Sequence, residues 1–518
     1  MRIFKNKSII TAAAILLFNI AFFAVIANVF PVGFEECDDF MMASIANGTY
    51  LGEPDCHLVY MNALYGSLLV FLYRLVPSVE WYTYLLALFQ ILSITVASYY
   101  TVRDIRSRIL KASLLFVLYS VWSYIIFYLE FTTVAGVLAL ASVILLQKRH
   151  FSLGALFFFV SFMVRYHCAG MVFILSVPIL VYEYGRDWKS YLKIGLILCF
   201  AGVLHLGNNA FYQDKEWKEY KEYNEIRGKI SDNPNREKCK SELLKIMSES
   251  DYVLLSHSFH DPDIATTDVL KQTYSVLESN KIENKIVNVK ELLINKYWHL
   301  ILINFILLSV LVLKNSKRAF VVTAVASYLL WVALLGYVSL NGTPKYRVVI
   351  SSLLPLLWLW VIWGLQIKDV YRIVVFSVFC VVLCYVGFVR EIRGGEFFRV
   401  NVEETINQEQ KEILEECKNK FLVPYCNDFK IELFSPFHLK SQIRRKQIVF
   451  FGWMARYPLK TGYLTYRDFV DGDALLFISK SRTTANVQNS IKEHYSIDTD
   501  TIHVKETENY ALIKFVKK

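Results

Sequence analysis

Four carboxylates lie within five consecutive positions near the N-terminus, directly after a long apolar run. They are Glu35, Glu36, Asp38 and Asp39. At a membrane surface, such a cluster could supply a general base that removes a proton from an acceptor hydroxyl, or could hold a metal ion. The alternative is a solvated acidic turn that caps a helix predicted over 41–48, because carboxylates are favourable near a helix N-terminus.

Further ionisable residues interrupt apolar stretches later in the chain. Arg165 and His167 lie in the run SFMVRYH, Lys345 and Arg347 in NGTPKYR, and Glu130 follows a predicted helix. Ionisable side chains at membrane depth are costly and usually functional. The alternative for each is a charge that extends to the membrane surface, or an ordinary turn.

Together these residues describe one type of chemistry. Fixed positive charges stabilise a phosphate leaving group, and the forked arginine side chain suits phosphate geometry. A neighbouring carboxylate could activate an acceptor hydroxyl. The combination favours transfer of a group from a lipid-linked phosphate carrier to an acceptor outside the cytoplasm.

The composition indicates where these residues must be held. Of 518 residues, 55% are hydrophobic and 20% are charged, and the mean hydropathy is +0.36. Soluble chains average about 45–50% apolar and about 25% charged residues. Disordered, collagenous and small disulfide-rich proteins are excluded, and a multi-pass membrane protein with some soluble mass is predicted. The net charge of +10 is attributed to basic cytoplasmic loops, not to nucleic-acid binding.

The apolar runs predict about eleven transmembrane helices. The first, 8–30, follows Arg2, Lys5 and Lys7, which places the N-terminus in the cytoplasm. The run 58–76 is predicted to lie on the membrane surface, because a span there would put the basic residues of 103–111 outside. The remaining spans are predicted at 80–102, 110–129, 132–147, 151–166, 168–184, 190–208, 297–314, 319–340, 346–366 and 371–389.

This topology divides the chain into two regions. A transmembrane region, 1–389, carries a first outer loop at 31–79 and a large outer loop at 209–296. The remainder, 390–518, is predicted to be a small extracytoplasmic α/β domain. Its elements are a helix at 407–421 and strands at 448–453, 473–479 and 510–516.

Nine cysteines are present, and two pairs share an outer segment. Cys37 and Cys56 lie in the first loop, and Cys417 and Cys426 lie in the C-terminal domain. Either pair could form a disulfide in an oxidising compartment. The cysteine spacing does not resemble a metal site.

The acidic pair Asp38–Asp39 after the first span resembles the GT-C superfamily of integral-membrane glycosyltransferases, which use polyprenyl-phosphate sugars. The helix containing Ala43–Gly48 and the segment His57–Gly66 resemble the surface helices of that family, although the prolines typical of the second are missing. The resemblance implies that Asp38 or Asp39 is the catalytic base, without deciding between them.

The same resemblance implies that outer basic residues bind the carrier phosphate. Arg165 and Arg347 suit this role best, with Lys345 and His167 behind them, and Glu36 and Glu130 complete the candidate substrate site. We therefore expect an inverting transfer of a sugar from a lipid-linked donor to a glycan, lipid or protein acceptor at the cell membrane. No cofactor is required, although a divalent metal ion could bind the acidic cluster.

Two other functions are considered, and the large loop has two alternative roles. An O-antigen polymerase or ligase would rely on outer-loop arginine and histidine, and a transporter would place charges in mid-membrane helices. In the large loop, an aromatic segment could contact a sugar or serve a structural role. Its notable residues are Trp217, Tyr220, Tyr223, Asn224 and Arg227.

Overall fold

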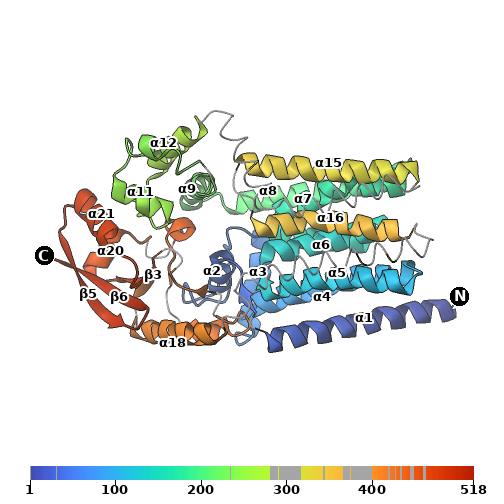
Figure 1. The fold of residues 1–518 in the computed structure, drawn as a ribbon, viewed down its shortest axis with the longest axis horizontal. Coiled ribbons are helices and arrows are strands. Elements are labelled where there is room, and N and C mark those ends of the chain that lie inside the picture. The colour runs from blue at the N-terminus through green and yellow to red at the C-terminus, as the bar shows by residue number, and fades with distance from the viewer. Residues whose placement is uncertain are drawn as a thin grey trace.

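The structure is a computed structural model and is mostly helical (Figure 1). It describes residues 2–30, 32–233, 235–279, 317–341, 345–365 and 400–518, with three isolated residues at 290, 374 and 378. Within the last range, 418–419, 426–427, 432–433, 444–447 and 459–462 are excluded. The predicted spans 297–314 and 371–389, and the domain boundary at 389/390, lie almost wholly outside the described residues.

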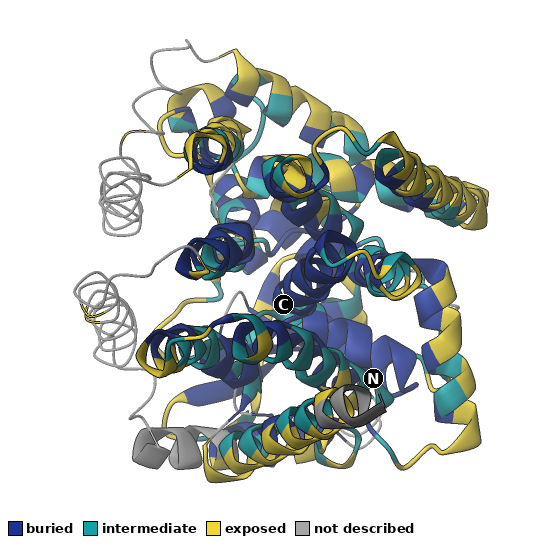
Figure 2. Ribbon diagram, turned by 90° about the vertical axis from the view of Figure 1, so that its right-hand side faces the viewer, coloured by how far each residue is buried: buried dark blue, intermediate teal, exposed yellow. Residues whose placement is uncertain are grey.

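Seven helices among the described residues are long and apolar enough to cross a membrane. They are α1 (Arg2–Val29), α4 (Trp81–Asp104), α5 (Arg108–Phe127), α7 (Phe151–Tyr184), α8 (Trp188–Phe211), α15 (Arg318–Asn341) and α16 (Tyr346–Gly364). A shorter apolar helix, α6 (Phe131–Gln147), is buried along its whole length. Buried segments lie toward the middle of the bundle, and exposed faces point outward (Figure 2).

Those outward faces are apolar, as expected of helices that contact lipid. Leu17 on α1, Leu206 on α8 and Leu329 on α15 are each about two-thirds exposed. A soluble protein rarely exposes contiguous apolar surface of this extent. The structure therefore supports the predicted membrane protein.

The chain reverses direction within α7. Arg165 has an extended backbone conformation (φ −157°, ψ 95°) that interrupts the helix. The rings of Phe158 and Phe173 lie 5.3 Å apart, and those of Phe151 and Tyr184 lie 6.2 Å apart. A straight helix of 34 residues would separate its ends by about 50 Å. The two halves are therefore antiparallel, as the sequence predicted for 151–166 and 168–184.

The non-membrane segments gather at one end of the bundle, opposite the N-terminus (Figure 1). They comprise α2 (Cys37–Ala46), α9 (Lys215–Ser231), α10 (Lys240–Leu243), α11 (Glu249–Ser256), α12 (Thr267–Glu278) and the C-terminal domain. The helix α3 (Ala63–Leu75) has 13 residues, which is too short for a span. It exposes Leu64, Leu68 and Phe71 along one face, which suits the predicted surface helix.

The C-terminal region forms a four-stranded sheet with the order β3-β4-β6-β5. Its strands are β3 (Phe421–Pro424), β4 (Ala474–Ser479), β5 (Thr499–Glu506) and β6 (Tyr510–Lys517). β3 is parallel to β4, while β6 is antiparallel to β4 and β5. The accompanying helices are α18 (Val400–Glu416), α19 (Leu439–Ile443), α20 (Tyr466–Asp471) and α21 (Ala485–Tyr495).

The structure corrects parts of the prediction for this domain. The predicted strand 448–453 is wrong, since only Ile448 makes an isolated bridge and a 3₁₀ turn, η3 (Gly452–Met454), follows. The predicted helix ends at Glu416, which frees 421–424 to form β3. Cys37 and Cys56 are free thiols, so the first suggested disulfide is absent. Cys426 lies outside the described residues.

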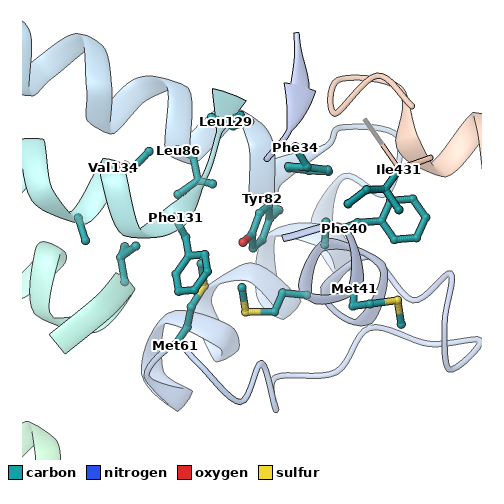
Figure 3. Packing of buried hydrophobic residues seen from close by; sticks show 14 of the residues in the cluster. Phe34, Phe40, Met41, Met61, Tyr82, Leu86, Leu129, Phe131, Val134 and Ile431 are labelled. Atoms are coloured by element: carbon teal, nitrogen blue, oxygen red, sulfur yellow. The ribbon is translucent and has the colours of Figure 1, made fainter. Parts of the chain in front are cut away.

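The first outer loop packs directly against the C-terminal domain. The ring of Phe40 on α2 lies 5.9 Å from Phe434 and 6.2 Å from Phe450. Figure 3 shows Phe40 beside Ile431, with Phe34 and Tyr82 in the same apolar cluster. This packing fixes α2, and therefore its acidic N-terminus, between the bundle and the soluble mass.

Candidate functional site

A short parallel strand pair brings the acidic run to the bundle. β1 (Gly33–Phe34) pairs with β2 (Tyr128–Leu129), and the Glu35 amide donates to the Leu129 carbonyl at 3.3 Å. β2 ends immediately before Glu130 at the start of α6. Residues nearly a hundred positions apart are therefore held side by side.

Asp39 is a structural carboxylate where the first outer loop meets the helix bundle. Its side chain is fully buried, and one oxygen accepts hydrogen bonds from the Tyr82 hydroxyl at 2.7 Å and the Phe131 amide at 3.1 Å. Burial raises the pKa of Asp39 well above its usual value, and the charge of Glu130 adds to that effect. Asp39 therefore joins α2, α4 and the N-terminus of α6.

Glu130 caps the same helix. One oxygen accepts from the Thr133 amide at 2.8 Å, and the residue is fully buried. Burial raises the pKa of Glu130, while the guanidinium groups of Arg347 and Arg165 oppose this shift. Two buried carboxylates thus satisfy free amides at one helix N-terminus, where the helix dipole favours negative charge.

Arg347 lies at the centre of the acidic cluster. This residue of α16 lies 2.9 Å from Glu36, 3.7 Å from Glu130 and 3.9 Å from Asp38. The Asp38 side chain is 19% exposed, whereas Asp39 is 0% exposed. The Asp38 side chain is therefore open to solvent and that of Asp39 is not, although the two residues are adjacent in sequence.

Arg165 borders this cluster from the reversal in α7. Its Nη1 donates to the Tyr60 carbonyl at 3.3 Å, and its guanidinium lies 5.2 Å from the ring centres of Tyr60 and Phe131. The reversal presents this arginine at the same end of the bundle as Glu130. The extended backbone at Arg165 therefore places its guanidinium beside Tyr60 and Phe131.

Two predicted residues point elsewhere. Lys345 pairs with Asp232 at 3.7 Å and is 45% exposed. His167 is exposed and contacts the Tyr166 ring, which in turn packs against His205 of α8. Neither residue has a described contact with the acidic cluster, so both are weaker candidates than Arg165 and Arg347.

The structure adds Arg227 and Asn224 to the site. The Asn224 side chain hydrogen-bonds with Tyr60 and accepts from Arg227 Nε at 3.0 Å. Arg227 also interacts electrostatically with Asp38 and Tyr60. The sequence could have indicated this pair, because residues three apart on the polar helix α9 share one face.

The aromatic residues of the large loop form packed structure. The Trp217 ring stacks on His57 with 4.4 Å between centres and 9° between planes. Tyr220 and Tyr457 pack on Trp217, and the Tyr457 hydroxyl donates to the His57 carbonyl at 3.0 Å. These rings therefore hold the large loop, the first loop and the C-terminal domain together.

The carboxylates around Arg347 are not among the described residues whose metal-ligand atoms lie close to one another. Their oxygens surround a guanidinium, which supplies the positive charge itself. The described residues hold two groups whose ligand atoms lie within 4.8 Å of one another: Asp55–Cys56–His57 and Asp251–Glu493–His494. In the first, Asp55 and His57 hydrogen-bond to each other at 2.7 Å.

The chain matches no protein-family model, no curated protein and no solved structure in the comparisons made. The geometry of this site is therefore the guide to function. That geometry offers two partly exposed carboxylates beside Arg347, Glu36 and Asp38. Of the two, Asp38 also interacts electrostatically with Arg227. Such an arrangement can bind an anionic group and accept a proton in the same place.

Proposed function

We propose that this protein is an integral-membrane glycosyltransferase that moves a sugar from a polyprenyl-phosphate carrier to an acceptor hydroxyl on the extracytoplasmic side. The observation that carries the proposal is the convergence of Asp38 with three arginines at the end of an apolar helix bundle. Lipid surface and polar site are adjacent there, as a lipid-linked donor requires.

In this proposal Asp38 is the general base. It takes the proton of the acceptor hydroxyl while the acceptor oxygen attacks C1 of the sugar, and the C1–O bond to the carrier phosphate breaks with inversion. The leaving phosphate keeps the bonding electrons. Its added negative charge is stabilised by Arg165 and Arg227, which lie beside the cluster.

Arg347 and Glu130 orient this base. Asp38 shares Arg347 with Glu36 and Glu130, so one guanidinium holds the three carboxylates around it. Asp39 holds α2 in place through Tyr82 and Phe131 and takes no part in proton transfer. The two aspartates therefore have separate roles.

The test is sugar transfer from polyprenyl-phosphate donors by purified protein in nanodiscs. Asp38→Asn is expected to reduce turnover at least ~100-fold, the lower range for loss of a general base, with unchanged donor binding. Asp268→Asn is the matched control, because Asp268 also lies in the first turn of a helix but is exposed on α12. Full activity of folded Asp38→Asn would refute the proposed role of Asp38.

A further inference from the structure

A cavity of about 470 Å³ lies between the large loop and the C-terminal domain. Its wall combines aliphatic side chains, such as Leu254 and Ile264, with polar ones from α11 and α21. Its volume falls within the range of roughly 300–1,000 Å³ typical of small-ligand sites. The residues that line this cavity are separate from Asp38 and the arginines around it.

His260 on the cavity wall indicates that the cavity takes a polar ligand. It is 4% exposed, and neither ring nitrogen has a hydrogen-bond partner. Burial lowers the pKa of His260 to about 3, which leaves the imidazole neutral. A buried polar group without a partner costs roughly 1–3 kcal/mol, so a partner from a bound ligand would be favourable.

The polar edge of the same cavity carries a set of metal-ligand atoms. Asp251 of α11 and Glu493 and His494 of α21 each offer one atom, all within 4.8 Å of one another. His494 Nε2 lies 2.8 Å from one Asp251 oxygen. Protein ligands at about 2.0–2.2 Å from zinc lie about 3.3 Å apart, so small side-chain movements would admit an ion.

The surroundings already orient these ligands. The Ser490 hydroxyl donates to the second Asp251 oxygen at 2.7 Å, which fixes the carboxylate. Hydrogen bonds of this kind orient metal ligands and raise affinity. One imidazole with two carboxylates is a ligand set for divalent transition metals such as Zn²⁺ and Mn²⁺.

We propose that Asp251, Glu493 and His494 bind a divalent transition-metal ion at the edge of this cavity. Three protein ligands leave coordination positions open toward the cavity, where His260 lies. The ion also joins α11 of the large loop to α21 of the C-terminal domain. This site is separate from the acidic cluster at Arg347 and does not depend on the proposed glycosyl transfer.

The test is calorimetric titration of the full-length, chelator-treated protein with ZnCl₂, together with its melting temperature with and without Zn²⁺. We expect saturable binding of one ion and a higher melting temperature, because a ligand of the folded state stabilises it. His494→Ala and Asp251→Asn should each weaken binding at least ~10-fold.

His503→Ala is the matched control, since His503 is an exposed histidine of the same domain that pairs with Glu506. It should bind Zn²⁺ as the wild type does. Should either ligand variant fail to fold, Glu493→Gln replaces it, because Glu493 is exposed. Absence of binding by the wild type, or equal binding by ligand and control variants, would overturn the proposal.

Discussion

Substitutions at Asp39 test whether this carboxylate is structural, in contrast to the catalytic role proposed for Asp38. In Asp39→Ala, the Tyr82 hydroxyl and the Phe131 amide lose their shared acceptor inside the protein. Each buried, unsatisfied group costs roughly 1–3 kcal/mol, so the expected loss is roughly 2–6 kcal/mol. Asp39→Asn keeps an oxygen that can accept from both donors and should therefore cost less than Asp39→Ala.

The effect of Asp39→Asn should depend on pH, with a defined sign. Burial and the nearby Glu130 charge raise the pKa of Asp39 in the folded state. The folded protein therefore binds this proton more tightly than the unfolded chain, whose value is about 3.9. The resulting stability is complete below that unfolded value and is lost as pH rises through the folded pKa.

Asparagine has no such proton to lose. The melting temperature of Asp39→Asn, relative to that of the wild type, should therefore increase as pH rises through this window. The assay is a fluorimetric melting series of both variants and the wild type in one detergent, from about pH 5 to 8.

Two results would refute this reasoning. One is a loss of stability in Asp39→Asn as large as in Asp39→Ala, which would mean that the negative charge itself is needed. The other is a difference between Asp39→Asn and the wild type that moves in the opposite direction with pH.

Three further substitutions test other parts of the structure. Arg347→Met leaves three carboxylates facing one another, so the free energy of unfolding should fall by roughly 3–5 kcal/mol, as for a broken buried ion pair, and the melting temperature should fall with it. Arg347→Lys keeps a positive charge and should reduce the free energy of unfolding by less. Asp261→Ala removes the acceptor of the Tyr466 amide and the Tyr495 hydroxyl, which join the C-terminal domain to the large loop. Limited proteolysis should therefore cleave the large loop faster than in the wild type. Gly66→Ala would place a Cβ atom 2.2 Å from the Cys56 carbonyl oxygen, and size-exclusion chromatography should show little folded protein.

Local sequence signals predicted the helices well. Apolar length predicted the seven described helices that are long enough to cross a membrane, whereas the predicted span 132–147 is a shorter helix and the count of eleven stays a prediction. The polar SFMVRYH run coincides with the reversal at Arg165. In the C-terminal domain, β4 and β6 were predicted because most of their side chains are buried and apolar. The strand β5 was missed because it is largely exposed and its sequence, TDTIHVKE, is polar.

Distant pairing decided which predicted site residues meet. Glu36, Asp38, Glu130 and Arg347 converge because β1 pairs with β2 and because α16 begins beside them. Neither contact can be predicted from the local sequence pattern. Lys345 pairs with Asp232 instead, although it lies only two positions from Arg347.

The sequence by itself determined the membrane character of the protein, its helical segments and the residue types available for chemistry, because these follow from apolar length and charge. Only the tertiary structure showed that Asp39 is buried and that Asp38 is partly exposed beside Arg347. Successive residues on a helix point about 100° apart, so one of them faces the buried Tyr82 and the other faces Arg347. Which of the two faces the core depends on what packs against α2, and that packing includes Phe434 and Phe450, which lie about four hundred residues further along the chain.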